Sequence, residues 1–323
     1  MGLMKYRQLG RTQLKISEVG FGCWAIGGSS YGPTKDEESL EALEVARDHG
    51  INFLDTADTY GHGHSEELIA RFLKGKPRES IIIASKVGWD FYHGGARKNF
   101  DPGYIRFACE ESLKRLGIET LDLYQLHNPK VEEIEREEAV GVLEQLKREG
   151  KIRFIGISIG RQDEAYAALE DPRVDAIQLI FNMIDQRMAD GVFELAAGRK
   201  VGIIAREPLA CGILTGKYGA EHEFAKDDHR RRWNKEKMAL DIEKLKKIQQ
   251  IVSSDRMSIV RAALEYVLHF PEVSTVIPGA KTKEQVLENL KATLDPKLRI
   301  QEASHLRDLY DRDEIFSKGL IPS

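Results

Sequence analysis

The chain has 323 residues and a formal net charge of −4 at pH 7; 41% of its residues are hydrophobic and 31% are charged. This composition is typical of a globular protein with ample apolar core, and it gives no electrostatic reason to expect nucleic acid or an anionic membrane as a partner. The N-terminus lacks an apolar signal core, and nowhere do about 18 apolar residues run together. We therefore expect a soluble, cytoplasmic protein.

An N-terminal hairpin is the first predicted element. Two short extended segments flank Gly10 and Arg11, and we expect them to close the floor of a barrel. From residue 19 onwards, apolar strand-like segments alternate with segments of helical period, which is the pattern of a parallel sheet covered by helices. The predicted strands span residues 19–24, 51–56, 81–86, 121–127, 151–158, 175–182, 201–206 and 274–280. The predicted helices span about 36–49, 64–74, 103–116, 135–149 and 162–169, and amphipathic segments follow the last three strands.

Eight such units without a linker predict one (β/α)8 barrel domain over residues 1–323. A doubly wound dinucleotide-binding sheet is the alternative, but Gly20, Gly22 and Gly27 lack the spacing of its glycine fingerprint and lead into a loop. In the helix predicted over 103–116, Cys109 lies on the apolar face and is expected in the core.

The charged segment 212–238 forms a long loop after the seventh strand. We expect its run of Asp and Arg residues to be a solvated surface, since charge runs usually are; a lid whose basic residues grip a ligand is the alternative. The residues concerned are Asp227, Asp228, Arg230, Arg231 and Arg232.

Four polar side chains follow three of the predicted strands. Asp55 and Tyr60 come at and just after the end of the second strand, Lys86 ends the third, and His127 ends the fourth. The carboxyl ends of parallel barrel strands meet at the mouth, so these side chains should meet there. Taken singly, each residue of this kind is more often a structural group that satisfies loop backbone than a catalytic one.

Together, these groups suit hydride transfer to a carbonyl carbon. Tyr60 can protonate the carbonyl oxygen if its pKa, near 10 when unperturbed, is brought down by a buried Lys86 ammonium. Asp55 would keep that lysine charged, and His127 would orient the carbonyl as a hydrogen-bond donor.

Several segments, in order, resemble the aldo-keto reductase superfamily, from about residue 5 to residue 293. They are GFGCW, LDTADTYGHGHSE, SK, LYQLHNP, PLACGILTGKY and IPGAKTKEQVLENL. The resemblance implies a (β/α)8 barrel that binds a nicotinamide cofactor, usually NADPH, without a Rossmann domain. It also implies that Asp55, Tyr60, Lys86 and His127 form the catalytic tetrad.

The resemblance also places the cofactor. It implies that Ser158 and Gln178 hold the nicotinamide carboxamide. The strand-end turn beside the ring is Gly22, Cys23 and Trp24. The segment along the pyrophosphate includes Pro208, Leu209, Gly212 and Lys217. The adenosine end is held by Gly279, Lys281, Thr282, Gln285, Glu288 and Asn289.

Lys281 favours NADPH over NADH. It precedes a predicted helix whose N-terminal amides suit an anion such as the ribose 2′-phosphate; a surface lysine near a helix start is the alternative.

Two positions depart from the family's commonest pattern. Ile159 replaces an asparagine that binds the carboxamide, and Arg206, followed by Glu207, replaces an aromatic ring that stacks on the nicotinamide. We hypothesise that Arg206 either disfavours the cationic oxidised cofactor or is neutralised by Glu207.

The sequence thus predicts an NADPH-dependent reductase of aldehydes or ketones, with NADH as a possible donor and no particular substrate or oligomeric state. A non-catalytic nicotinamide-binding subunit or redox sensor is the alternative. A metal-dependent hydrolase is disfavoured, because His62, His64 and His93 have no further ligand at useful spacing. Four aromatic residues of the mouth loops could wall a substrate pocket: Trp24, Trp89, Tyr92 and Trp233.

Overall fold

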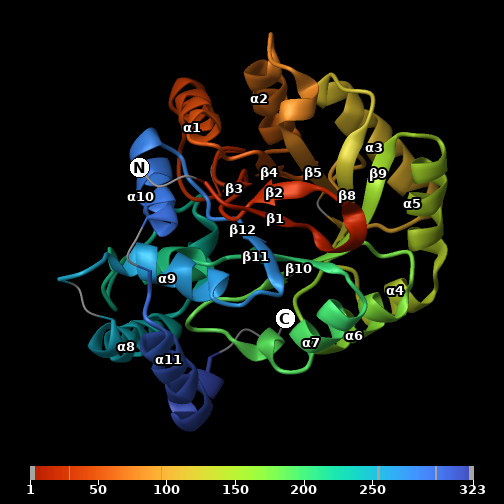
Figure 1. Cartoon of the computed structure of the whole chain (residues 1–323). Coiled ribbons are helices and arrows are strands. Elements are labelled where there is room, and N and C mark those ends of the chain that lie inside the picture. The colour runs from red at the N-terminus through yellow and green to blue at the C-terminus, as the bar shows by residue number, and fades with distance from the viewer. Residues whose placement is uncertain (1–3, 29, 96, 253–254, 295–296, 320–323) are drawn as a thin grey trace.

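The computed structural model describes residues 4–28, 30–95, 97–252, 255–294 and 297–319. Its main sheet has eight parallel strands, each hydrogen-bonded to the next in chain order. They are β3 (Phe21–Gly22), β4 (Phe53–Asp55), β5 (Ile82–Val87), β8 (Leu121–His127), β9 (Ile152–Ser158), β10 (Ala176–Ile180), β11 (Gly202–Arg206) and β12 (Val273–Val276). Parallel bridges from Val19 to Val276 and from Gly22 to Gly279 join the first strand to the last. The predicted (β/α)8 TIM barrel is confirmed (Figure 1).

Helices surround this ring of strands. They are α1 (Asp36–Asp48), α2 (His64–Leu73), α3 (Pro102–Leu116), α4 (Val131–Glu135), α5 (Glu138–Arg148), α6 (Gln162–Glu170), α7 (Val192–Gly198), α8 (Lys235–Ile251), α9 (Ile259–Leu268), α10 (Lys283–Leu290) and α11 (Ile300–Arg312). Helix α3 illustrates how the sequence sets the bounds: Pro102 occupies its first turn, and Gly117 ends it at φ +66°. Cys109 is fully buried on its inner face, as predicted. Among the described residues, no helix is both long and apolar enough to cross a membrane.

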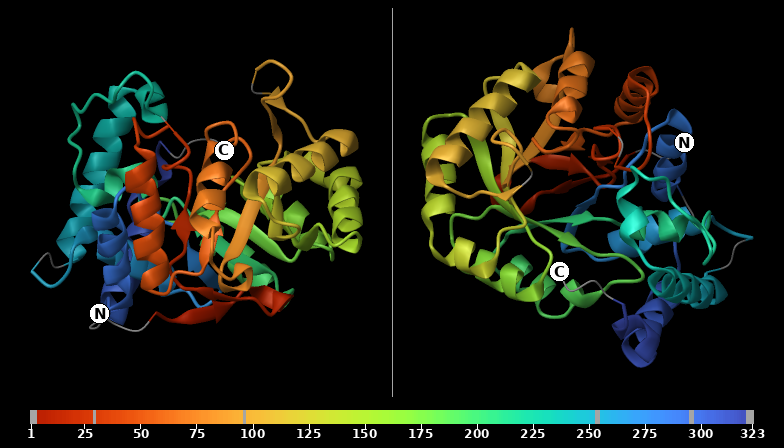
Figure 2. Two further views of the ribbon diagram at one scale, coloured as in Figure 1. Left: turned by 90° about the horizontal axis from the view of Figure 1, so that it is seen from above. Right: turned by 180° about the vertical axis from the view of Figure 1, so that it is seen from behind.

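The N-terminal hairpin closes the barrel floor, as predicted. Strands β1 (Tyr6–Gln8) and β2 (Lys15–Ser17) pair antiparallel across one end of the barrel (Figure 2). Leu9 and Ile16 are fully buried and belong to the core inside the barrel. Gly10, between the strands, has φ +51°, and a Cβ there would lie 2.3 Å from the backbone nitrogen of Gly202. Only glycine therefore allows the hairpin to sit this close to β11.

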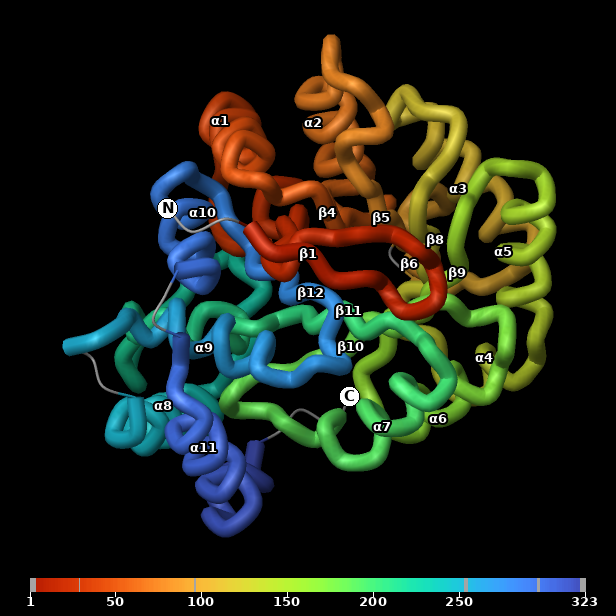
Figure 3. The backbone as a smooth tube through the Cα atoms, viewed as in Figure 1, coloured from red at the N-terminus to blue at the C-terminus, as the bar shows by residue number. Residues whose placement is uncertain are grey.

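Two parts of the chain differ from the predicted rhythm. The helix expected over 135–149 is α5, and an additional short helix, α4, precedes it; Glu137, between the two, has φ +61°. A short hairpin of β6 (Trp89–Asp90) and β7 (Arg97–Lys98) follows β5. Helices α8 and α11 are additional to the regular units and project together from one side of the barrel (Figure 3).

The charged segment 212–238 is not simply a solvated surface. Arg230 and Asp228 are buried and form a two-pronged ion pair, with distances of 2.6 and 2.9 Å. Arg230 also donates to the Tyr218 hydroxyl at 3.1 Å, so it holds the loop rather than facing a ligand. The expectation of a solvated run is wrong for this pair, because a guanidinium that is fully paired and stacked on rings can be buried.

Candidate active site

The structure brings Asp55, Tyr60, Lys86 and His127 together at one end of the barrel. Asp55 and His127 end β4 and β8, and Lys86 lies near the end of β5 between them. Tyr60 comes from the loop before α2. That loop is held by Gly61, which has φ +62° and at which a Cβ would lie 1.5 Å from the carbonyl oxygen of Gly27.

Lys86 is the centre of the cluster. Its side chain is fully buried, and its Nζ donates to Asp55 Oδ2 (2.7 Å), the carbonyl of Thr56 (2.8 Å) and the Tyr60 hydroxyl (3.2 Å). Burial acts to lower the pKa of Lys86, but Asp55 and Tyr60 outweigh it and raise that pKa above its ordinary value. The amine is therefore a charged ammonium whose three protons are all directed at acceptors.

The second carboxylate oxygen of Asp55, the one not hydrogen-bonded to Lys86, also accepts hydrogen bonds. This oxygen, Oδ1, accepts from Gln178 Nε2 at 2.7 Å and from Gln125 Nε2 at 3.3 Å. The carboxylate thus has partners on both oxygens although it is only 2% exposed. Two strand-borne amides that face the barrel axis therefore hold the acid that faces Lys86.

The pKa of Tyr60 is raised, not lowered as the sequence suggested. Burial raises it most, Asp55 adds to this, and the Lys86 ammonium offsets only part of the shift. The correction follows from burial depth, which the sequence does not give. Tyr60 is consequently a neutral phenol at pH 7, with an O–H available for donation.

His127 faces Tyr60 edge to face, with 5.9 Å between ring centres. Burial lowers its pKa well below the ordinary value, and the nearby charges of Lys86, Lys98 and Arg206 lower it further. The imidazole is therefore neutral at pH 7 and carries a single N–H. Its Nδ1 has no hydrogen-bond partner among the described residues.

A cavity of about 920 Å³ opens beside this cluster. Trp24, Trp89 and Trp233 line it, as the sequence suggested, and Trp24 stacks on Tyr60 with 6.0 Å between ring centres. Tyr92 does not line it, because its ring packs between Phe91 and Phe107 instead.

Side-chain amide and hydroxyl groups lie near the C-terminal ends of β8, β9 and β10. Ser158 Oγ lies 3.4 Å from Gln178 Oε1 and 3.4 Å from Asn128 Oδ1. The side chain of Ile159 is fully buried in the outer core and faces away from them. Sequence reasoning missed Asn128, and the signal available for it was its place directly after His127 at a strand end.

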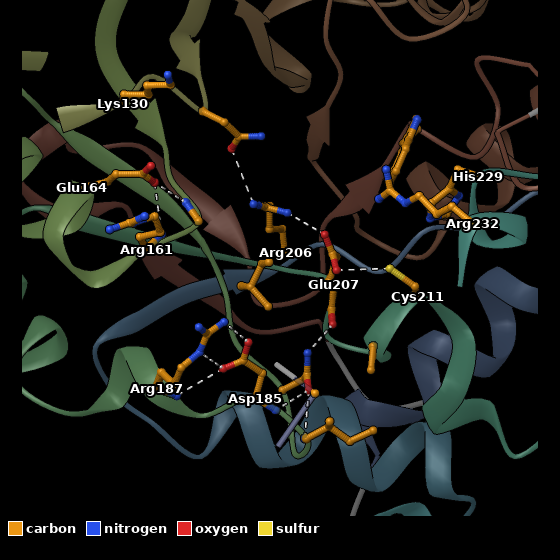
Figure 4. A pocket seen from close by; sticks show the side chains of 18 of the residues that line it. Lys130, Arg161, Glu164, Asp185, Arg187, Arg206, Glu207, Cys211, His229 and Arg232 are labelled. Atoms are coloured by element: carbon orange, nitrogen blue, oxygen red, sulfur yellow. Dashed lines mark hydrogen bonds and ion pairs between the residues drawn. The ribbon is translucent and has the colours of Figure 1, made fainter. Parts of the chain in front are cut away.

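Arg206 and Glu207 lie on the cavity wall (Figure 4). Arg206 Nη1 lies 2.5 Å from Glu207 Oε1, and the Cys211 thiol donates to Glu207 Oε2 at 3.1 Å. Arg206 Nη2 also contacts Asn128 Oδ1 (3.5 Å) and the carbonyl of Ile159 (3.3 Å). The guanidinium therefore lies over the amide and hydroxyl groups, with its charge paired.

The turn at the end of β3, which contains Gly22 and Cys23, contributes mainly backbone groups to the candidate site. The Cys23 amide donates to the carbonyl of Asp55 at 2.9 Å, and the Cys23 side chain is fully buried. Gly22 pairs with Gly279, so the turn before α10 lies directly beside it.

The resemblance assigns two segments to the pyrophosphate and adenosine of the cofactor, residues 208–217 and residues 279–289. Pro208 and Leu209 lead into the turns of residues 210–215, where Gly212 has φ +97°. Lys217 is exposed and close enough to act, with other groups, on the pKa of Glu288. Lys217 thus lies near enough to α10 for its charge to be felt there.

Lys281 and its neighbours form the start of α10. The Lys281 amide donates to Gln285 Oε1 at 2.7 Å, and its Nζ donates to the carbonyls of Tyr31 and Gly32, at 3.1 Å for Gly32. Thr282 is the residue preceding the helix, and Asn289 is buried on its inner face. Glu288 accepts a hydrogen bond from the Ser258 hydroxyl at 2.6 Å.

The three histidines considered as metal ligands have other contacts. His62 stacks on Phe91, His64 lies 2.9 Å from Asp36, and His93 lies 3.0 Å from Asp90. No group of three or more potential ligands capable of holding a metal occurs in the part of the chain that the structure describes.

A barrel with this buried acid, amine and phenol at its mouth is the architecture of a nicotinamide-dependent carbonyl oxidoreductase. Residues 18–311 match the Aldo/keto reductase family, and the chain belongs to it. It is therefore an NAD(P)H-dependent enzyme of that family.

Individual relatives support this over nearly the full length. The chain is 32% identical to the aldo-keto reductase yakc [NADP(+)] of Schizosaccharomyces pombe, covering 95% of this chain and 92% of that one. It is 31% identical to the NADH-specific methylglyoxal reductase of Escherichia coli, covering 95% and 98%. The solved holo form of aldo-keto reductase AKR11C1 from Bacillus halodurans is 32% identical, with a TM-score of 0.81 over 95% of this chain and 96% of that one.

Proposed function

We propose that this enzyme reduces an aldehyde or ketone to an alcohol with NADPH as the hydride donor, and that Tyr60 protonates the carbonyl oxygen. The observation that carries the proposal is the position of Lys86 Nζ, 2.7 Å from Asp55 and 3.2 Å from the Tyr60 hydroxyl, at zero solvent exposure.

Tyr60 acts as the general acid in this proposal. When bound, the reduced nicotinamide supplies the hydride. As negative charge builds on the carbonyl oxygen, the Tyr60 O–H donates its proton, and the adjacent Lys86 ammonium stabilises the phenolate left behind. The raised pKa of Tyr60 keeps the proton in place until an alkoxide, which is far more basic than a phenolate, develops beside it.

His127 orients the carbonyl. A neutral imidazole has one N–H to donate, and its lowered pKa removes it as a competing acid at pH 7. One proton donor and one fixed hydrogen bond are enough for the reaction, so Tyr60 and His127 have separate roles.

The chemistry of the strand-end groups suits the nicotinamide carboxamide. The Ser158 hydroxyl lies 3.4 Å from the side-chain amide oxygens of both Gln178 and Asn128, and a carboxamide needs both donors and acceptors. We propose that Asn128 supplies the amide contact that Ile159 cannot.

The preference for NADPH rests on Lys281. Lys281 directly precedes Thr282, the residue before the eight-residue helix α10, and a phosphate at that helix start would gain from both the lysine charge and the helix amides. The two curated relatives described above carry names with different cofactors, so Lys281 and not the relatives favours NADPH.

Multiple-turnover assays test the function. Purified protein is given NADPH or NADH with a panel of aldehydes and ketones, and cofactor oxidation is matched to alcohol formation. We expect repeated turnover. Tight cofactor binding without turnover on any carbonyl would instead support the non-catalytic subunit or sensor.

A further inference from the structure

Lys98 reaches from the β6–β7 hairpin to the end of β8. Its Nζ donates to the backbone carbonyls of His127 (2.6 Å) and Asn128 (2.8 Å) and lies 4.3 Å from the centre of the Trp89 ring. Lys98 and Trp89 both line the cavity. An ammonium has three protons, so one N–H of Lys98 has no acceptor among the described residues.

Lys98 also has no carboxylate partner within 4 Å in the described part of the chain, and neither do two other cations of the wall, Lys130 and Arg232, which lie on opposite sides of the cavity (Figure 4). The remaining wall cations are paired: Arg161 with Asp163, Arg187 with Asp185, Arg206 with Glu207, and Lys237 with Asp241.

The acidic groups that face Lys98 are engaged elsewhere. Glu133 of α4 accepts from the Lys130 amide at 2.7 Å, and Glu164 of α6 accepts from the amides of Gly160 and Arg161 at 2.9 and 3.1 Å. A third acid, Glu132, is exposed on α4. On the side of β11, Lys98 faces the Arg206 guanidinium. Glu133 and Glu164 act on the Lys98 charge from a distance, but among the described residues none forms an ion pair with it.

We infer that the substrates of this enzyme carry a carboxylate or similar anionic group in addition to the carbonyl, and that Lys98 binds that group. The inference rests on the proposed function, because it assumes a carbonyl held by Tyr60 and His127. Lys98 lines the cavity and donates to the backbone carbonyl of His127, so its ammonium lies beside the residue proposed to orient the substrate carbonyl. An anion there would take the free N–H and the unpaired charge.

Matched substrate pairs test the inference. The values of kcat/KM are compared for 4-carboxybenzaldehyde and succinic semialdehyde, each against its methyl ester, in the wild type, Lys98→Gln and Lys98→Arg. The control is Arg97→Gln, since Arg97 is an exposed neighbour on the same hairpin and does not line the cavity. We expect the wild type to prefer at least one acid by about tenfold or more, as a charge-assisted hydrogen bond provides. The acid-to-ester ratio should collapse in Lys98→Gln and persist in Lys98→Arg and Arg97→Gln.

A pH series gives an independent readout. Lys98 is an exposed residue, but partial desolvation of its ammonium lowers the pKa of Lys98 to about 8, against the opposing influence of Glu133 and Glu164. Because kcat/KM reports the free enzyme, the preference for the acid should fall above pH 8 in the wild type and persist to higher pH in Lys98→Arg.

Equal kcat/KM for acid and ester in both wild-type pairs, or an unchanged ratio in Lys98→Gln, would overturn the inference. Turnover of the esters shows in either case that the reductase function stands. Failure to turn over any of the four compounds or the wider carbonyl panel would refute the proposed function and, with it, the inference.

Discussion

Arg206 and Glu207 are consecutive in the sequence and form an ion pair with 2.5 Å between Nη1 and Oε1. Glu207 adopts φ +55°, which turns its carboxylate back towards the Arg206 side chain, and its other oxygen accepts from the Cys211 thiol. The pairing favours the second of the two roles considered for Arg206, in which its charge is neutralised.

The relative affinities for reduced and oxidised cofactor test this pairing. With its charge paired, Arg206→Ala should change the ratio of NADPH to NADP+ affinity by less than about twofold. Glu207→Gln leaves the guanidinium uncompensated beside the cationic oxidised ring, so it should weaken NADP+ binding several-fold relative to NADPH. Calorimetric titration of both variants measures the ratio. A large change in Arg206→Ala would show that the charge is not neutralised.

Lys281 and Lys283 form a matched pair at the start of α10. Lys283 pairs with Glu41 at 2.8 Å on the surface, whereas the Lys281 ammonium faces the loop of Tyr31 and Gly32. We expect Lys281→Ala to lower kcat/KM for NADPH relative to NADH by about tenfold or more, because a charge-assisted phosphate contact is lost. Lys283→Ala should leave the ratio unchanged. Equal ratios in both variants and the wild type would remove the 2′-phosphate role from Lys281.

In the proposed mechanism, the pH dependence of reduction follows from the two opposite pKa shifts of Tyr60 and His127. Tyr60 donates only while protonated, and its raised pKa delays loss of activity to above its ordinary value of about 10. His127 acts as the neutral imidazole, and its lowered pKa delays loss on the acid side to well below about 6.5. For a neutral aldehyde, kcat/KM should therefore be level between about pH 6.5 and 10. An inflection within this range that tracks Tyr60 or His127 in variants would contradict the assignments.

Removing the Lys86 ammonium should destabilise the fold. Lys86→Met leaves the Asp55 carboxylate buried without its cation, and we expect the free energy of unfolding to fall by about 3–5 kcal/mol. Adding Asp55→Asn removes the stranded charge and should restore part of the loss. Denaturant unfolding of the single and double variants gives both values. A double variant less stable than Lys86→Met would show that the pair is not coupled in this way.

The barrel and the four-residue cluster could be predicted from the sequence because both depend on local pattern. Strand and helix periods fix the order of the units, and parallel strands bring Asp55, Lys86 and His127 to one end whatever the loops do. No local pattern marks the additional helix α4 or the left-handed conformation of Glu137 that separates it from α5. The burial that raises the pKa of Tyr60 also depends on the assembled barrel.

Lys98 and Arg230 show that the contacts of charged residues could not be predicted from the sequence either. The sequence predicts a solvated surface for the charged segment that contains Arg230, and it gives no indication of a role for Lys98. Arg230 is buried because the ring of Tyr31, from a distant part of the chain, joins the rings of Tyr218 and Phe224 around it. Lys98 reaches the active-site rim because a short hairpin folds across to β8. Neither contact has a sequence signal, because each joins residues from separate parts of the chain.

Hydride transfer in Tyr60→Phe is the most direct test of the mechanism. Single-turnover oxidation of bound NADPH by a reactive aldehyde is measured, together with NADPH affinity. Removing only the hydroxyl next to Lys86 should lower the rate by orders of magnitude while cofactor affinity stays within a few-fold of the wild type. A variant that transfers hydride at close to the wild-type rate would show that Tyr60 is not the proton donor.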